Sequence, residues 1–411
     1  MYYKRHIEAT IKRIAKRKPV IVITGARQVG KSTMLKNTFS DINNVSLNRP
    51  LVRSSAAENP SLFFELNKPP VIVDEIQKVP ELFDYVKDVV DTDNAEKTGQ
   101  FYLTGSQSQK LMERVSDSLA GRAGIVKMLG LSCRELDGVS CSEVFKPTKT
   151  HIDEISKASP DFDYDTLITR IHKGSFPELY KTESDLDDWS DYYDSYFQTY
   201  IEKDVKDVLN IRDEIAFVKF VRACASLSGE ILNFVTLAEM CGKDVGTAKS
   251  WLSVLVSSGL VYMLEPYHNN FSKRLVKSPK MYFLDTGLAC WLLGWNTPQQ
   301  LINGAAWGHI FESFVFAEIL KSYYNAGKTT PQIFYYRDTD KNEIDLLIKD
   351  GDVLHPIEIK TTSDPKKAMV SSFKQIEKIP DMKIGEGAVI CLAKEVLPLG
   401  DEVWILPANL I

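Results

Sequence analysis

Short apolar runs, separated by segments with helical patterning, recur along the first 145 or so residues. Such runs predict buried strands, and the intervening segments predict helices. The strands are expected at residues 20–24, 45–47, 71–74, 101–104 and 125–129. Regular alternation of the two element types predicts a parallel sheet with helices on both faces, which is an α/β fold.

The middle of the chain, residues 210–285, has the pattern of a winged helix. The expected elements are a helix, a turn, a second helix and two wing strands, at residues 235–240, 242–246, 247–257, 260–264 and 281–284. Between Glu265 and Asp285 the chain carries no acid but four basic residues, Lys273, Arg274, Lys277 and Lys280. This local positive patch is compatible with DNA contact through the wing, but winged helices also serve as packing modules.

A β-hairpin is predicted between residues 342 and 360, because the Asp-Gly pair at residues 350–351 is a strong turn signal. Glu358 and Lys360 lie two apart on the return strand and therefore project from one face. Pairing of the two strands would gather Asp345, Glu358 and Lys360 into one cluster. A hairpin with one solvated, charged face fits the same pattern.

Composition limits the class of protein. The chain has 411 residues, enough for two to four domains, and a net charge of −5, so any nucleic-acid binding must use local patches. Its six cysteines are scattered without a C-x-x-C pair, which argues against zinc sites and a disulfide framework. No signal peptide or membrane-spanning run is evident, and we expect a cytoplasmic protein without membrane contact.

The clearest chemical signal is GARQVGKS, which fits the phosphate-binding P-loop pattern between an expected strand and an expected helix. Backbone N–H groups of such a loop cradle phosphate oxygens, while Lys31 reaches the β- and γ-phosphates and Ser32 ligates Mg²⁺. The predicted ATP-binding residues of the loop are Gly25, Ala26, Arg27, Gln28, Val29, Gly30, Lys31, Ser32 and Thr33.

A second signal, a pair of acidic residues, follows the P-loop by about forty residues. The apolar run at residues 71–73 ends in Asp74 and Glu75. Asp74 has the chemistry of a Walker B residue that holds the magnesium shell opposite Ser32. Glu75 is then placed to orient or deprotonate the attacking water, as a general base. Polar groups after the strand at residues 101–104 could sense the γ-phosphate, although an ordinary loop fits as well.

Asp345, Glu358 and Lys360 together would form a site for a second divalent ion, with a lysine for water activation or phosphate neutralisation. This layout resembles the PD-(D/E)xK nuclease superfamily, with Asp345 as the first acid and Glu358-Ile359-Lys360 as the (D/E)-x-K element. The resemblance implies that Glu312, on an expected helix, is the acid carried by the first core helix. Ile344 stands where the pattern has its leading proline.

The whole chain resembles a family of prokaryotic ATP-binding proteins with an N-terminal AAA+-type ATPase domain and a C-terminal uncharacterised domain. The matching stretches, in chain order, are GARQVGKST, VIVDEIQKVP, YLTGSQS, SLAGRAG, LSCREL, KGSFPE, YFQTYIEKDV, YFLDTGLACWLLG and GHIFESFV. In addition to Glu75, Arg122 in the stretch SLAGR is a candidate catalytic residue that would sense the γ-phosphate. The alternative is that Arg122 pairs with a local acid. Arg27 is a second candidate sensor.

Four segments follow from these expectations. They are an AAA+-type ATPase domain at 1–145, a linker and helical segment at 146–209, a winged helix at 210–285 and a PD-(D/E)xK nuclease-like domain at 286–411. Within 146–209, the polar stretch up to residue 165 is expected to be the linker.

The sequence is compatible with three functions. The first is an Mg²⁺-dependent ATPase whose nucleotide state controls the C-terminal half. The second is an ATP-dependent switch that recruits a protein partner or self-associates. The third is an ATP-regulated nuclease acting on DNA or RNA. Intact Asp74 and Glu75 favour turnover over simple binding, and the net negative charge favours a protein partner over extended nucleic-acid binding.

Overall fold

The computed structural model describes residues 2–92, 97–106, 109–140, 143–181, 186–200, 213–268 and 278–411. Its chain divides into two compact units. Unit 1 comprises Met1–Leu131 with the short segments Ser257–Gly259 and Tyr323–Thr329. Unit 2 comprises Ser132–Val256, Leu260–Ser322 and Thr330–Ile411.

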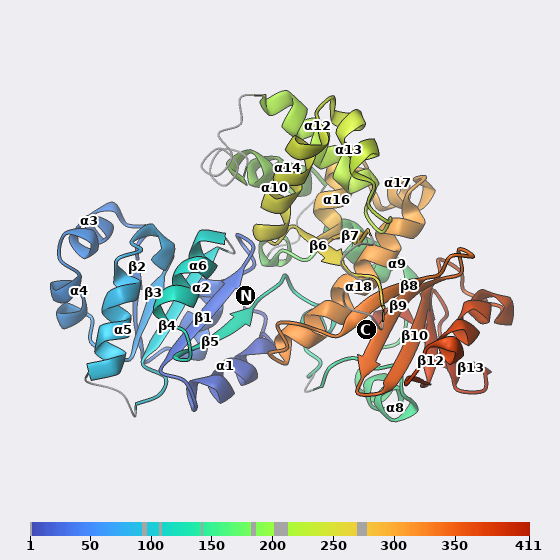
Figure 1. The fold of residues 1–411 in the computed structure, drawn as a ribbon, viewed down its shortest axis with the longest axis horizontal. Helices are drawn as coiled ribbons and strands as arrows, with labels where there is room; N and C mark the ends of the chain where they lie inside the picture. Colours follow the sequence, from blue (N-terminus) through green and yellow to red (C-terminus); the bar gives the residue numbers. More distant parts are fainter. Residues whose placement is uncertain are drawn as a thin grey trace. The chain divides into compact units, whose positions relative to one another are not determined.

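Unit 1 is built on a five-stranded parallel sheet (Figure 1). Its strands are β1 (Val20–Gly25), β2 (Asn43–Ser46), β3 (Val71–Asp74), β4 (Phe101–Ser106) and β5 (Ala123–Lys127). All five expected strands are present, with ends that differ by up to two residues. Their order is β2-β3-β4-β1-β5, so β4 lies between the P-loop strand β1 and the acid-bearing strand β3. The carboxyl ends of β1, β3 and β4 therefore meet at one edge of the sheet.

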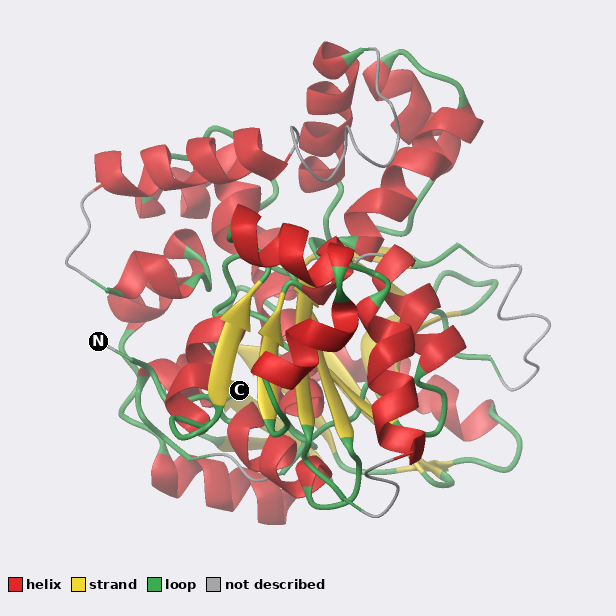
Figure 2. Ribbon diagram, turned by 90° about the vertical axis from the view of Figure 1, so that its left-hand side faces the viewer, coloured by secondary structure: helices red, strands yellow, loops and turns green. Residues whose placement is uncertain are grey.

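Helices cover both faces of this sheet, as Figure 2 shows by its red helices against yellow strands. The helices of unit 1 are α1 (Ile7–Ala15), α2 (Lys31–Thr38), α3 (Pro50–Glu58), α4 (Pro60–Leu66), α5 (Leu82–Thr92) and α6 (Gln109–Ser118), with the short 3₁₀ helix η1 (Ile76–Lys78). Alternate strand residues such as Val20, Val22 and Val71 pack against α4, α5 and α6. On the other face Phe39, which follows α2, packs on Tyr102 with ring centroids 4.4 Å apart. The N-terminal unit is thus the α/β layered fold that the sequence predicts.

The helical part of unit 2 begins earlier than the boundary expected at residue 145. Ser132 caps α7 (Cys133–Leu136) in a capping box with Glu135, and the Cys133 N–H donates to the buried Glu318 carboxylate at 2.9 Å. The linker expected up to residue 165 contains α8 (Lys149–Ala158), because His151, Ile152 and Ile155 form a buried stripe. The other helices are α9 (Tyr164–Lys173), η2 (Pro177–Tyr180), α10 (Leu186–Tyr200), α12 (Glu214–Ser226), α16 (Thr286–Leu292), α17 (Pro298–Asn303), α18 (Trp307–Asn325), η4 (Lys367–Lys378) and η5 (Ala408–Leu410).

The elements expected for the winged helix are all present. The helices are α13 (Phe234–Cys241) and α14 (Val245–Ser257), and the strands β6 (Val261–Leu264) and β7 (Lys280–Phe283) pair in antiparallel register, with Leu264 opposite Lys280. Gly242 ends α13 in the left-handed conformation, with φ of 66°. Three of the four basic residues of the expected patch, Lys273, Arg274 and Lys277, lie outside the described residues.

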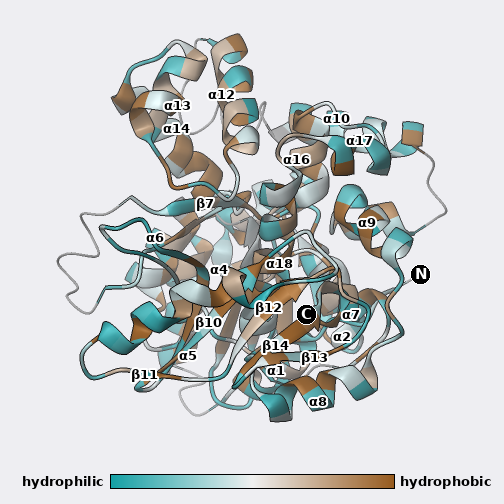
Figure 3. Cartoon of the chain, turned by 90° about the vertical axis from the view of Figure 1, so that its right-hand side faces the viewer, coloured by the Kyte–Doolittle hydropathy of each residue, from teal (hydrophilic) through white to brown (hydrophobic). Residues whose placement is uncertain are grey.

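The C-terminal part of unit 2 contains a seven-stranded mixed sheet. Its strands are β8 (Ile333–Arg337), β9 (Glu343–Asp350), β10 (Val353–Ile359), β11 (Lys383–Ile384), β12 (Gly387–Cys391), β13 (Leu397–Gly400) and β14 (Val403–Pro407). The predicted hairpin is β9–β10, with Gly351 in its turn at φ of 63°. Strand β10 pairs in parallel with β12, which pairs in parallel with β14. Figure 3 shows the hydrophobic character of β12 and β14.

Among the described residues, no helix is long and apolar enough to cross a membrane.

Candidate functional site

The P-loop follows β1 and leads directly into α2. Gly25 is required at the end of β1, because a Cβ there would lie 2.1 Å from the Met128 carbonyl oxygen on the chain leaving β5. Gly30 precedes α2 with φ of 93°, and Gln28 also has a positive φ of 62°. Positive φ values in consecutive turns aim successive N–H groups into one concavity, which suits an anion. The loop geometry therefore fits phosphate.

Lys31 is buried within this loop. Its Nζ donates to the carbonyl oxygens of Gly25 at 2.9 Å and Ala26 at 2.8 Å. The ammonium thus lies beside the backbone that would surround a phosphate, at the N-terminus of α2.

Asp74 gathers hydroxyl groups from three other elements. Its Oδ1 accepts from the Ser32 hydroxyl and from Thr104 Oγ1 at 2.6 Å, and its Oδ2 accepts from Ser46 Oγ at 3.0 Å. The contacts come from α2, β4 and β2 and converge on the carboxyl end of β3. Hydroxyl and carboxylate oxygens are the ligands that Mg²⁺ prefers, so Ser32 and Asp74 fit a magnesium site.

Glu75 follows Asp74 in the left-handed conformation, with φ of 60°. Its N–H donates to Thr104 Oγ1 at 3.2 Å, so this threonine contacts both members of the Asp-Glu pair. Gln77 Nε2 donates to the Glu75 carboxylate and to Ser106 Oγ at 3.2 Å. A positive φ in a residue other than glycine is uncommon and is often found at functional sites. Sequence reasoning missed Gln77, although its position two residues after the acid is a usable signal.

Arg122 lies at the opposite edge of the sheet from the P-loop. The Val20 N–H donates to the Arg122 carbonyl oxygen at 3.4 Å, which places Arg122 beside the start of β1, whereas the loop follows its end. At the usual rise per residue, the two edges are about 16 Å apart. The Arg122 side chain makes a double ion pair with Asp91, at 2.5 Å and 2.7 Å. The phosphate-sensing role expected for Arg122 is therefore not supported within one chain, and the alternative of a local acid is observed.

Arg5 holds the P-loop in place through hydrogen bonds to backbone carbonyl oxygens. Its guanidinium donates to the carbonyl oxygens of Val29 at 2.9 Å, Leu129 at 2.7 Å and Gly130 at 2.9 Å. Arg5 is buried just before α1. The N-terminal segment is thus hydrogen-bonded both to the phosphate-binding loop and to the chain that follows β5.

A second cluster lies wholly within unit 2. The four predicted residues of the C-terminal site come together there, from α18, β9 and the end of β10. Lys360 Nζ is 3.0 Å from Asp345 Oδ2 and 2.6 Å from Glu358 Oε2, and the Ile359 N–H donates to Asp345 Oδ2 at 2.8 Å. The side chains of Asp345 and Glu358 therefore meet on one face of the hairpin.

Glu312 joins this cluster through Lys280, a residue of β7. Lys280 Nζ lies 3.1 Å from Glu312 Oε1, 2.7 Å from Glu343 Oε1 and 3.8 Å from Asp345 Oδ1. The Tyr282 hydroxyl, also on β7, donates to Glu312 Oε1 at 2.5 Å. The expectation that Lys280 contributes to an exposed basic patch is wrong, because its side chain is 3% exposed. The pairing of β7 with β6 turns Lys280 toward the acids of the neighbouring elements.

The crowding of acids shifts their ionisation. Burial, with the nearby Asp345 carboxylate, raises the pKa of Glu358, and burial also raises the pKa of Glu312. Burial alone would raise the pKa of Asp345, but Lys280 and Lys360 reverse this and lower it. Asp345 is thus the acid that the two lysines keep ionised.

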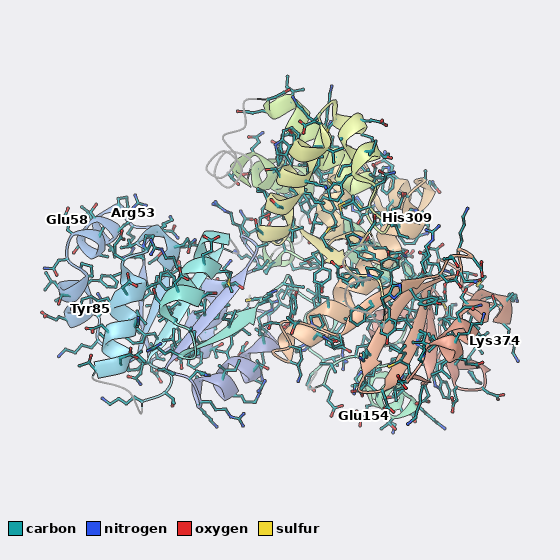
Figure 4. The ribbon with its side chains drawn as sticks, in the orientation of Figure 1. Arg53, Glu58, Tyr85, Glu154, His309 and Lys374 are labelled. Atoms are coloured by element: carbon teal, nitrogen blue, oxygen red, sulfur yellow. The ribbon has the colours of Figure 1, made fainter. Side chains whose placement is uncertain are left out.

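One further group of potential metal ligands is present in the described part of the chain. Glu143, His151 and Glu154 bring three ligand atoms within 4.8 Å of one another. Glu143 and Glu154 are exposed, and Glu154 is labelled in Figure 4. Exposed acidic groups of this kind are common without an ion. The ligand atoms of Glu312, Asp345 and Glu358 do not all lie within 4.8 Å of one another.

Comparison with family models divides the chain into three matches. Residues 17–137 match an AAA domain, residues 164–299 match a domain of unknown function (DUF8612), and residues 307–411 match another (DUF4143). The first match agrees with the parallel sheet, the P-loop and Asp74. Unit 1 thus has an AAA-type P-loop ATPase fold.

Two curated relatives are similar to nearly the whole chain. They are uncharacterised proteins of Mycobacterium bovis and Mycobacterium tuberculosis, each 26% identical over 99% of this chain and 84% of the relative. Among solved structures, a Walker-type ATPase of Pyrococcus abyssi has a TM-score of 0.45 and 14% identity, over 71% of this chain and 96% of that one. The RuvB Holliday junction branch migration motor of Thermotoga maritima has a TM-score of 0.29 and 16% identity, over 62% and 88%.

Proposed function

We propose that this AAA-type fold works as an Mg²⁺-dependent ATPase and that its nucleotide state controls unit 2. The observation that carries the proposal is the convergence of Ser32, Thr104 and Ser46 on Asp74, beside a P-loop with Lys31 at its centre. Hydroxyls and a carboxylate at the carboxyl ends of parallel strands, next to a helix N-terminus, are what a metal–triphosphate complex needs.

Each residue has a distinct role in hydrolysis. The N–H groups of residues 25–33 and the Lys31 ammonium would bind the β- and γ-phosphates, while Ser32 and Asp74 would hold the metal. Bound Mg²⁺ would neutralise charge on the phosphate oxygens. Glu75 accepts a proton from the water that attacks the γ-phosphorus, the bond from that phosphorus to the β–γ bridging oxygen breaks, and ADP leaves. Gln77 holds the Glu75 carboxylate through the contact described above.

The test is nucleotide binding and turnover by the full chain. Lys31→Ala removes the ammonium that contacts phosphate, so calorimetry should show ATP binding abolished. Ser40→Ala, an exposed hydroxyl in the same unit, is the matched control and should bind ATP as the native chain does. Unchanged ATP affinity in Lys31→Ala would overturn the assignment.

A second candidate function is supported by the C-terminal cluster. The meeting of Asp345, Glu358 and Lys360 on one face, with Glu312 nearby, favours a nuclease-like site for a divalent ion. The carboxylate oxygens would hold the ion, and Lys360 would orient water or neutralise phosphate. Mn²⁺- or Mg²⁺-dependent cleavage of plasmid or single-stranded DNA should then vanish in Asp345→Ala. Cleavage that persists in this variant would mean a different site or a contaminant.

The role of unit 2 is addressed by measuring ATP hydrolysis with and without double-stranded DNA. Stimulation by DNA favours a nucleic-acid partner, for which α13 and α14 with their two strands are the proposed contact. Hydrolysis that ignores DNA favours a switch that recruits a protein partner or a second copy.

A further inference from the structure

The side chain of Lys280 ends among the carboxylates of the C-terminal cluster. Oxygens of Glu312, Glu343 and Asp345, from α18 and β9, lie 3.1, 2.7 and 3.8 Å from its Nζ. An ammonium group has three N–H donors, and here it has three carboxylates around it. The lysine therefore supplies positive charge to the acids that the metal-site proposal assigns to an ion.

The position of Lys280 is fixed by its strand. Lys280 lies opposite Leu264 of β6 and forms a bridge with Ile231 on its other side. The adjacent Met281 N–H donates to the Glu230 carbonyl oxygen at 3.1 Å. Because β7 is paired on both sides at Lys280, its backbone has little freedom, and the Lys280 ammonium is held at the cluster. An exposed lysine on a loop would not be held in this way.

The surroundings of the ammonium are those of a buried ion. The Lys280 side chain is 3% exposed, and those of Glu312 and Asp345 are each 12% exposed. Its Nζ also lies 5.8 Å from the centre of the Tyr335 ring. A buried lysine without anions would be strongly unfavourable, so the acids and the lysine stabilise one another.

We propose that Lys280 is a built-in cation that occupies the C-terminal cluster and competes with a divalent ion for the same carboxylate oxygens. The proposal rests on the nuclease-like metal site suggested above and adds what controls it. The ammonium lies 3.1 Å from Glu312 Oε1 and 3.8 Å from Asp345 Oδ1. Mg²⁺ binds oxygen at about 2.1 Å, so an ion bound to these oxygens would lie close to the ammonium, and their like charges would repel. Binding of a divalent ion here is therefore weakened for as long as the ammonium stays in place.

Mn²⁺ titration of the nucleotide-free full chain tests this competition. Lys280→Met keeps an unbranched apolar side chain and removes the charge, so we expect Mn²⁺ to bind on the order of tenfold more tightly than to the native chain, or better still. The gain should disappear in Lys280→Met combined with Asp345→Asn, which removes a ligand from the same site. Lys280→Arg keeps the positive charge and should bind Mn²⁺ as weakly as the native chain.

Thermal unfolding is a second measurement, because removal of the Lys280 charge is expected to destabilise unit 2. All six tryptophans lie in unit 2, at residues 189, 251, 291, 295, 307 and 404, so tryptophan fluorescence follows its unfolding. Lys280→Met should lower the thermal midpoint, and Mn²⁺ should raise it again in a concentration-dependent way. Lys280→Gln, whose amide still donates to carboxylates, is the milder variant and should show the same Mn²⁺ effect.

The outcomes separate this inference from the metal-site proposal. If the native chain binds Mn²⁺ through Asp345 as tightly as Lys280→Met does, the metal site stands and the competition is refuted. If folded Lys280→Met and Lys280→Gln bind no Mn²⁺ that depends on Asp345, both proposals fail. If Lys280→Met and Lys280→Gln bind Mn²⁺ more tightly than the native chain does, and this binding depends on Asp345, both the metal site and the competition by Lys280 are supported.

Discussion

Thr104 Oγ1 donates a hydrogen bond of 2.6 Å to Asp74 Oδ1, linking the carboxyl ends of two neighbouring strands. The same oxygen accepts from the Glu75 N–H at 3.2 Å. One buried hydroxyl therefore orients the proposed metal ligand and the backbone of the proposed general base.

Replacement of Thr104 by valine tests this link. Thr104→Val keeps the shape of the side chain but removes both hydrogen bonds, one of them to a charged acceptor. We expect ATP turnover to fall roughly tenfold, with ATP binding largely kept. Steady-state hydrolysis and calorimetry measure the two quantities. Thr104→Ser retains the hydroxyl and should stay near the native rate. Native turnover in Thr104→Val would show that Asp74 does not depend on this contact.

Replacement of Glu75 by glutamine separates binding from chemistry. Glu75→Gln has the same size but cannot accept the proton of the attacking water. We expect ATP affinity to be retained and turnover to fall about a hundredfold or more. Single-turnover hydrolysis and nucleotide titration give the two values. Gln77→Ala, which only frees the carboxylate to move, should have a smaller effect. Hydrolysis at the native rate by Glu75→Gln would mean that another group is the base.

Arg122 provides a prediction of no effect. Since its side chain pairs with Asp91 at the far edge of the sheet, Arg122→Ala should leave ATP affinity and turnover unchanged in dilute protein. Asp91→Ala is the matched control and should change thermal stability as little as Arg122→Ala does, because the pair is exposed. A loss of turnover that grows with protein concentration would instead indicate that Arg122 acts on a neighbouring copy.

The stability of unit 2 should depend on pH through Glu358. Burial and Asp345 raise its pKa from 4.5 to about 8, so the folded state holds a proton that the unfolded state has lost between these values. The resulting stabilisation is fully present below pH 4.5 and is lost as the pH rises through about 8. Urea unfolding followed by tryptophan fluorescence should therefore show a decline over this window.

Glu358→Gln is the control for this pH effect, because its side chain cannot ionise. Its free energy of unfolding should fall less steeply than that of the native chain between the same two pH values. Equal slopes in the two proteins would assign the pH dependence to another group, such as Glu312, whose pKa burial raises from 4.5 to about 7.

Local pattern was sufficient to predict much of the fold. The strands of unit 1 and the hairpin of unit 2 were recognisable because a strand buried on both faces is apolar throughout and a tight turn uses Asp-Gly. The P-loop and Asp74 were recognisable because phosphate and magnesium restrict the residue types that can bind them.

Features that depend on long-range packing were not predictable in the same way. Lys280 belonged to an apparent basic patch because its neighbours in the chain carry positive charge, whereas its burial is decided by Glu312 and Glu343 on other elements. The location of Arg122, by contrast, is predictable from the sequence. It precedes its strand, and in a parallel sheet the residue before a strand lies away from the loops that follow the others.

The contacts of Arg5 have a practical consequence for anyone who trims this protein. The AAA match begins at residue 17, yet the guanidinium that holds the Val29 carbonyl comes from twelve positions earlier. A fragment of residues 17–137 would keep every residue of the nucleotide-binding signature. It would lose the hydrogen bonds from Arg5 to the carbonyl oxygens of the P-loop and of the chain after β5. Weak nucleotide binding by such a fragment would therefore be expected from the loss of the Arg5 contacts.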